Sequence, residues 1–125
     1  MTRREFLERH GLTCRNWRWS WSFVNHEKAF VVFGAWDDMR IDGEDVILSE
    51  DWERTHRNVR SPSYPQSREH IALIEKGYAL WTFEQYRGKA NDDPASDTAK
   101  MLGFRPVLSR RVLVKRGREW RAAAP

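Results

Sequence analysis

Apolar side chains recur along much of this chain at every second position, a pattern that is typical of β strands. From Trp17 to Phe23, aromatic and polar residues alternate strictly, which predicts a half-buried strand with three indoles and one phenyl ring on a single face. Asn25 to Lys28 is expected to form a hairpin turn. The stretch from Ala29 to Phe33 is apolar on both faces, so it is predicted to be a central strand of the sheet.

Four later stretches are also predicted to be strands: Asp45 to Leu48, Tyr78 to Tyr86, Leu102 to Leu108, and Arg110 to Lys115. Two segments lack this alternation of apolar and polar residues. Residues Ser49 to Tyr64 are expected to form an ordered, functional loop, and the Gly-, Asn-, Asp- and Pro-rich stretch from Arg87 to Thr98 a mobile one. Pro106 favours an edge position, Trp120 is expected to fold back over the sheet, and residues 122–125 are expected to be a tail.

Two helices are expected between these strands. A short one covers Arg3 to His10, and the main one covers about residues 67–76, with Ser67 or Ser63 as its N-cap and Gly77 closing it. These elements together predict an α+β fold with a curved antiparallel sheet or partly open barrel of five to six strands. At 125 residues the chain is expected to form a single domain, residues 1–125.

The start of the main helix combines two kinds of chemistry. Free N–H groups in the first turn of a helix attract anions, and Arg68 lies in that turn. Beside it, Tyr64 and Pro65 follow a loop stiffened by Pro62, and Tyr64 falls outside any apolar period. The sequence therefore predicts a shallow apolar surface, which we call the ledge, next to an anion-binding site.

Charge is distributed unevenly along the chain, whose net charge is +4. Eight acidic residues and one basic residue occupy the stretch from Asp37 to Glu53, whereas seven basic residues and one acidic residue occupy the stretch from Arg105 to Arg121. Arg54, Arg57 and Arg60 form a third, basic patch. This distribution predicts one face for a polyanion and another turned away from it.

Signatures of catalysis and metal binding are missing from the sequence. The single cysteine, Cys14, excludes an internal disulfide, and the His70 helix lacks the second histidine that a zinc-protease motif needs. We therefore expect a binding domain without enzymatic activity, cofactor or metal. The absence of a signal peptide and of a long apolar run predicts a cytoplasmic protein that does not bind membranes.

Arginines and aromatic residues are the chemistry that remains, and both are typical of nucleic-acid binding. The segment Ser63-Tyr64-Pro65-Gln66-Ser67-Arg68-Glu69-His70, behind a Trp-rich hairpin and before Phe104 to Leu108, resembles the sulfur-binding domains of McrA-like type IV restriction endonucleases. The resemblance implies recognition of double-stranded DNA that carries a phosphorothioate link. It also implies a possible HNH nuclease domain, in cis or in trans, that this sequence does not contain.

In that family, a tyrosine, the adjacent proline, an arginine stem and a small side chain form a shallow apolar cavity for the sulfur. The resemblance assigns the first two roles to Tyr64 and Pro65, leaves the arginine open between Arg15 and Arg18, and makes Ser67 the nearest small residue. Sulfur is less strongly hydrated than oxygen, so an apolar ledge favours the modified phosphate. The remaining predicted DNA contacts are Gln66 and Arg68 at base edges, with Arg57, Arg60, Arg105, Arg110 and Arg111 on phosphates.

Two alternative functions remain open. A methylated-base reader related to SRA or PUA-like domains would flip a base into an enclosed cage built from Trp36 or Trp81, which requires a deep slot. A protein-interaction module would use the Trp-rich and charged surfaces to hold an acidic partner. Salt-sensitive binding to ordinary duplex DNA would count against that second function.

Overall fold

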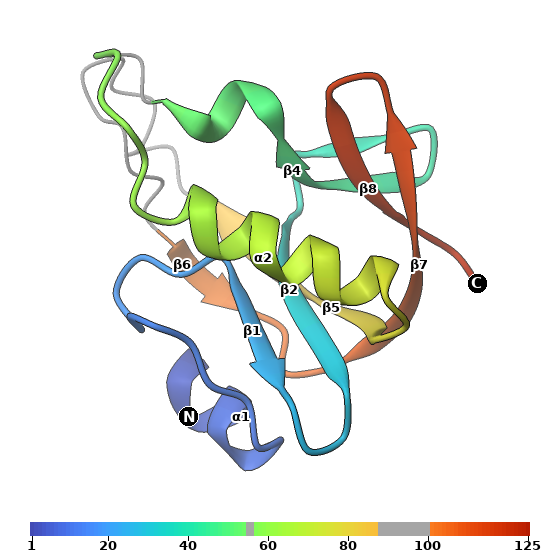
Figure 1. Cartoon of the computed structure of the whole chain (residues 1–125). Helices are drawn as coiled ribbons and strands as arrows, with labels where there is room; N and C mark the ends of the chain where they lie inside the picture. The colour runs from blue at the N-terminus through green and yellow to red at the C-terminus, as the bar shows by residue number, and fades with distance from the viewer. Residues whose placement is uncertain (55–56, 88–100) are drawn as a thin grey trace.

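The computed structural model describes residues 1–54, 57–87 and 101–125. These residues form an α+β fold with two α helices and an open, mostly antiparallel sheet of eight strands (Figure 1). The predicted fold class is confirmed, but the expected five or six strands were too few.

The helices are α1 (Arg3–Arg9), the 3-10 helix η1 (Glu50–Glu53) and α2 (Tyr64–Glu75). The strands are β1 (Ser22–Asn25), β2 (Phe30–Trp36), β3 (Arg40–Ile41), β4 (Glu44–Ser49), β5 (Ala79–Arg87), β6 (Met101–Phe104), β7 (Ser109–Arg116) and β8 (Glu119–Ala123). Along the sheet the order is β1-β2-β5-β7-β8-β4-β3, and β6 pairs with β5 off this path.

Strand β2 is central, as its two apolar faces predicted. It pairs with β1 in antiparallel fashion and with β5 in parallel, in a register that runs from Phe30 opposite Ala79 to Trp36 opposite Gln85. The parallel pair is possible because the long connection through β3, β4 and α2 carries the chain back to the same end of the sheet. In Figure 1, α2 crosses in front of the sheet and α1 lies below β1.

The two faces of β2 pack into two separate cores. Val31 and Phe33 contribute to the core beneath α2, and Val32 contributes to the core that includes residues of α1. All three side chains are fully buried. Their burial stabilises the domain by roughly 1.5–3 kcal/mol per side chain.

The predicted strand from Trp17 to Phe23 is wrong over most of its length, because β1 begins only at Ser22. The three indoles consequently do not share one face. Trp17 stacks on Phe23, Trp21 packs edge-on against Trp52, and Trp19 is exposed. Hydrogen bonds to side chains at the start of α2 hold the segment before β1 in place of a strand partner.

Helix α2 begins three residues earlier than expected, at Tyr64, with Pro65 in its first turn. A proline is well accommodated there because the N–H groups of the first turn have no partner inside the helix. Ser63 is the N-cap residue, but its side chain makes no capping hydrogen bond. Gly77 follows the C-cap with φ +121°, a conformation that favours glycine, so its predicted role in ending the helix is confirmed.

The C-terminal part of the chain is more regular than the sequence predicted. Trp120 and Ala122 are buried in β8, so residues 122 and 123 belong to a strand and not to a tail.

Strand β6 ends at Phe104, so the strand predicted from Leu102 to Leu108 is shorter than expected at its C-terminal end. The predicted mobile loop from Arg87 to Thr98 lies, apart from its first residue, outside the described residues.

Candidate nucleic-acid interface

Three hydrogen bonds fasten the segment before β1 to the start of α2. The Ser63 hydroxyl donates to the backbone carbonyl of Trp19, and the Gln66 amide donates to Ser20 Oγ at 2.8 Å. The backbone N–H of Arg15 donates to Gln66 Oε1 at 2.6 Å. Gln66 is only 4% exposed and both ends of its amide are occupied, so the prediction that it contacts base edges is wrong.

Tyr64 and Ser67 lie inside the molecule and not on an exposed ledge. Tyr64 is 5% exposed and belongs to the core beneath α2, and Ser67 is fully buried, with its hydroxyl 3.3 Å from that of Ser22. The prediction of an accessible tyrosine ring is therefore wrong, because the first turn of α2 directs this ring at the sheet. Its hydroxyl accepts a hydrogen bond from Arg68 Nη1 at 3.1 Å.

The solvent face at the start of α2 is formed by Pro65, Arg68 and Glu69. Pro65 is half-buried, whereas Arg68 and Glu69 are exposed. Spacings of three and four residues place all three on one side of the helix. This face retains the predicted pairing of an apolar surface with the N–H groups of a helix start, although the proline alone supplies the ring.

Of the two arginines left open by the sequence, the structure joins Arg15 to α2. Its guanidinium makes two hydrogen bonds to the carboxylate of Glu69, at 2.6 and 2.7 Å. Arg18 is exposed and has no carboxylate partner among the described residues. Arg15 therefore contacts the helix face at Glu69, one helical turn after Pro65, and Arg18 lies in the turn before β1.

His70 fastens α2 to β1 from the buried side of the helix. Its Nδ1 lies 2.6 Å from Ser22 Oγ, which also contacts the hydroxyl of Ser67. Burial lowers the pKa of His70 to about 4, so the ring is neutral at physiological pH. Since all three groups are buried, this cluster holds the helix in place and does not form an accessible nucleophile.

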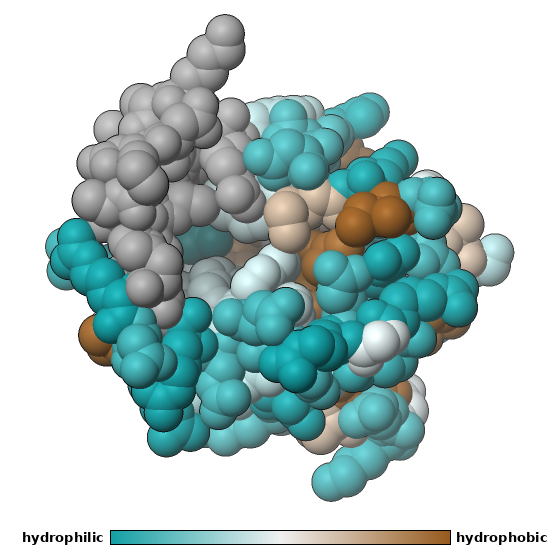
Figure 2. Space-filling view, turned by 90° about the horizontal axis from the view of Figure 1, so that it is seen from above, coloured by the Kyte–Doolittle hydropathy of each residue, from teal (hydrophilic) through white to brown (hydrophobic). Residues whose placement is uncertain are grey.

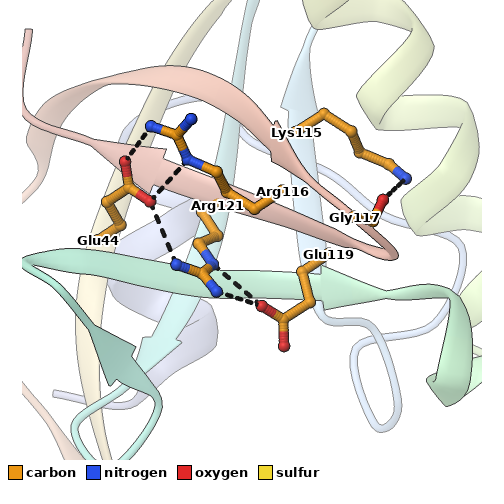
Figure 3. Close-up of polar contacts among 6 residues, drawn as sticks. All are labelled: Glu44, Lys115, Arg116, Gly117, Glu119 and Arg121. Carbon is orange, nitrogen blue, oxygen red and sulfur yellow. Dashed lines mark hydrogen bonds and ion pairs between the residues drawn. The ribbon is translucent and has the colours of Figure 1, made fainter.

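The prediction of separate acidic and basic faces is wrong. Strand β4 pairs with β8, and β8 with β7, so the acidic stretch and the end of the basic stretch lie side by side. Glu44 forms ion pairs with Arg116 at 3.0 Å and with Arg121 at 3.3 Å (Figure 3). The hydrogen bond that Arg116 donates to Glu44 lowers the pKa of Glu44.

These two ion pairs belong to a larger set of paired charges on β4, β7, β8 and η1, which we call the seam. The seam also contains the pairs Glu50 with Lys115, Asp51 with Arg118, and Glu119 with Arg121.

Three arginines near α2 lack such partners. Arg68, Arg110 and Arg111 have no carboxylate partner among the described residues, and all three line a hollow of about 640 Å³ between α2 and strands β5, β7 and β8. We call this hollow the α2–β7 groove. Seen from above, the molecule is hydrophilic over most of its described surface, with smaller hydrophobic patches (Figure 2).

Aromatic rings and one hydroxyl position the arginines of the groove. The Arg68 guanidinium lies 4.5 Å from the ring centroid of Trp120, and that of Arg110 lies 5.9 Å from the ring of Trp81. Arg111 donates from Nε to Thr82 Oγ1 at 3.3 Å. These contacts orient the cations without pairing them with a carboxylate, although Glu50 and Glu75 also line the groove.

The other predicted phosphate contacts do not line the groove. Arg105 lines a second hollow of about 410 Å³, in which the carboxylates of Asp37, Asp45 and Glu84 face three arginines, because Arg40 and Arg111 line it as well. Arg57 and Arg60 are exposed on the segment that leads to α2, and Arg60 pairs with Arg54 in an isolated bridge. Of the predicted phosphate-binding arginines, the structure therefore brings only Arg110 and Arg111 together with Arg68.

Trp19 is a surface residue whose exposure the sequence pattern did not predict. Its side chain is 47% exposed, although the alternation with Trp17 and Trp21 placed it in the core. The signal that distinguishes it is Ser63, whose hydroxyl binds the Trp19 carbonyl and holds this turn outside the sheet. That contact joins residues 44 positions apart, so no local pattern predicts it.

Comparison of the chain with protein families, with curated proteins and with solved structures found no match. Among the described residues, no group of three or more histidine, cysteine, aspartate or glutamate side chains is placed to hold a metal ion. Within the same part of the chain, none of the helices has the length and apolar character required to span a bilayer.

Proposed function

We propose that this chain is a duplex-DNA-binding domain that prefers DNA carrying a phosphorothioate link. The observation that carries the proposal is that Arg68, Arg110 and Arg111, none of which has a carboxylate partner among the described residues, line one groove beside α2. Unpaired cations gathered on one surface supply the sequence-independent part of DNA affinity, because they replace the counterions of the phosphates.

Preference for sulfur is assigned to the solvent face at the start of α2. Pro65 offers an apolar surface there, and the N–H groups of the first turn favour an anion. Sulfur is weakly hydrated, so its contact with Pro65 costs little, whereas an ordinary phosphate oxygen would lose favourable hydration at the same place. Arg15 stands along the same face and Arg18 on the adjoining turn, so either aliphatic stem can complete the apolar contact. In this proposal Tyr64 acts from beneath, by fixing the position of Pro65 and Arg68.

The lining of the groove supports surface contact over base flipping. The exposed residues Arg68 and Arg110 line it, and Trp36 lies in the second hollow, where three carboxylates and three arginines offset each other, so that neither hollow is an enclosed aromatic cage. An interaction module for an acidic protein is the second candidate. It is favoured by the apolar side chains of Ile74, Leu80 and Val112 that line the same groove.

The test is a gel-shift comparison of one duplex in three forms: plain, with a single phosphorothioate link, and cytosine-methylated. We expect binding to the sulfur form to be tighter by roughly five- to a hundredfold, as burial of one apolar group provides. Pro65→Ala should reduce this preference and leave binding to plain DNA unchanged. Preference for the methylated form, or failure to bind any duplex, would contradict the proposal; the second result would favour the acidic-protein partner.

A further inference from the structure

Trp19 presents an indole to solvent in a protein that covers its other tryptophans. All seven tryptophans of the chain lie within the described residues, and Trp19 is the only exposed one; the other six are half-buried or buried. Trp17 and Trp21 on either side pack against aromatic rings. An exposed indole offers a ligand a large, rigid apolar surface together with one N–H donor.

The backbone that carries this indole is held at several points. The N–H groups of Trp19 and Ser20 both donate to the carbonyl of Asn16, at 3.3 and 3.0 Å. Ser63 donates to the Trp19 carbonyl, and Gln66 donates to the hydroxyl of Ser20. The indole is thus exposed on a turn that is already ordered, so contact with a ligand costs little backbone entropy.

The surroundings of Trp19 are suited to a nucleic acid. Arg18 precedes it and has no carboxylate partner among the described residues, and Ser63 joins it to the first turn of α2, next to Pro65. An exposed aromatic ring beside a cation without a carboxylate partner forms a surface on which a deoxyribose packs while the cation binds the neighbouring phosphate.

We propose that Trp19 packs its indole against the deoxyribose and the exposed base edges of the bound duplex, next to the modified link. This inference rests on the proposed function and adds a residue that increases affinity without reading the sulfur. Trp19 therefore contributes equally to plain and modified DNA, whereas Pro65 contributes to the difference between them.

The test measures dissociation constants by fluorescence anisotropy on a plain duplex and on its single-phosphorothioate form, for the wild type, Trp19→Ala, Trp19→Phe and Ile41→Ala. Ile41 is the control because it is a similarly exposed apolar residue, on strand β3. We expect Trp19→Ala to weaken binding to both duplexes roughly tenfold, Trp19→Phe to retain most of the affinity, and Ile41→Ala to have no effect. Circular dichroism should show a native fold for all variants, because the turn is held by backbone groups of Trp19.

Acrylamide quenching provides a second measurement, in which the difference between the wild type and Trp19→Phe reports on Trp19 among the seven tryptophans. In the free protein Trp19 should be the most readily quenched indole, because it is the most exposed, and saturation with DNA should shield it. A change below twofold for Trp19→Ala, or an indole that stays equally quenchable in the complex, would overturn the role of Trp19. Equal wild-type affinity for the two duplexes, with the tenfold loss for Trp19→Ala, would overturn only the preference for sulfur.

Discussion

Two basic regions that are adjacent in sequence have opposite electrostatic surroundings in the structure. Arg110 and Arg111, near the start of β7, have no carboxylate partner among the described residues, although Glu50 and Glu75 also line the α2–β7 groove, whereas Arg116, at the end of the same strand, is paired with Glu44 in the seam. The difference arises from the sheet order, because β8 and β4 bring Glu44 next to the far end of β7. Basic residues in a run therefore do not contribute equally to binding a polyanion.

The largest effect is expected at Tyr64, whose ring is buried in the core beneath α2 and whose hydroxyl binds Arg68 of the groove. Tyr64→Ala removes a buried ring together with the hydroxyl that holds Arg68, and it should lower the free energy of unfolding by about 3–5 kcal/mol. Tyr64→Phe, the matched control, removes only the hydroxyl and should cost about 1 kcal/mol. Urea unfolding measures both. If Tyr64→Ala were as stable as the wild type, the ring would not be part of the core.

A fall in pH should loosen the α2 side before it affects the seam. The pKa of His70 is about 4 in the folded protein, against 6.5 when exposed, so the unfolded state binds the proton more tightly. Stability is therefore fully present above pH 6.5 and is lost as the pH falls towards 4, by up to about 3 kcal/mol. Thermal unfolding between pH 7 and pH 4 measures the loss, and His70→Asn should reduce its slope. A slope unchanged by His70→Asn would assign the loss to other groups.

The comparison between groove and seam is tested by two double variants with the same change in charge. Arg110→Ala with Arg111→Ala should weaken plain and phosphorothioate duplexes alike, by roughly thirtyfold at 0.15 M salt, and lower the salt slope by about two. Arg116→Ala with Arg118→Ala removes paired cations and should change the affinity less than threefold, because those side chains are already neutralised. Equal losses for the two double variants would show that net charge alone decides binding.

The smallest expected effect comes from releasing cations of the seam. Glu44→Gln removes the carboxylate that pairs with Arg116 and Arg121, and it should raise affinity for plain DNA two- to threefold, because one negative charge is lost and Arg116 is released, while Arg121 keeps Glu119 as its partner. Anisotropy at 0.05 M salt detects the gain, and Ile41→Ala is again the control. A decrease in affinity would mean that the seam supports the interface and is not merely neutral.

Much of the fold could be predicted from the sequence because it depends on local patterns. The double apolar face of β2, the period of β5 and the glycine after α2 are each readable within a few residues. Strand β8 escaped prediction because it is short and rich in alanine and charge, and is stabilised by pairing with β4 and β7.

The candidate site was less predictable because it depends on contacts between distant segments. The sequence indicated the start of α2 and the arginines around it, but the direction of Tyr64, the capture of Gln66 and the exposure of Trp19 follow from bonds between the segment before β1 and α2. Nor does the order of charges along the chain reveal that Glu44 neutralises Arg116, 72 positions later.

The most direct test of the account measures wild-type affinity for one duplex, with and without a single phosphorothioate link, at several salt concentrations from 0.05 to 0.2 M. The arginines of the groove act on charge and Pro65 acts on hydration. Both affinities should therefore fall steeply and in parallel with salt, while the ratio between them stays constant at roughly fivefold or more. Equal affinity for the two duplexes at every salt concentration would contradict the recognition of phosphorothioate DNA.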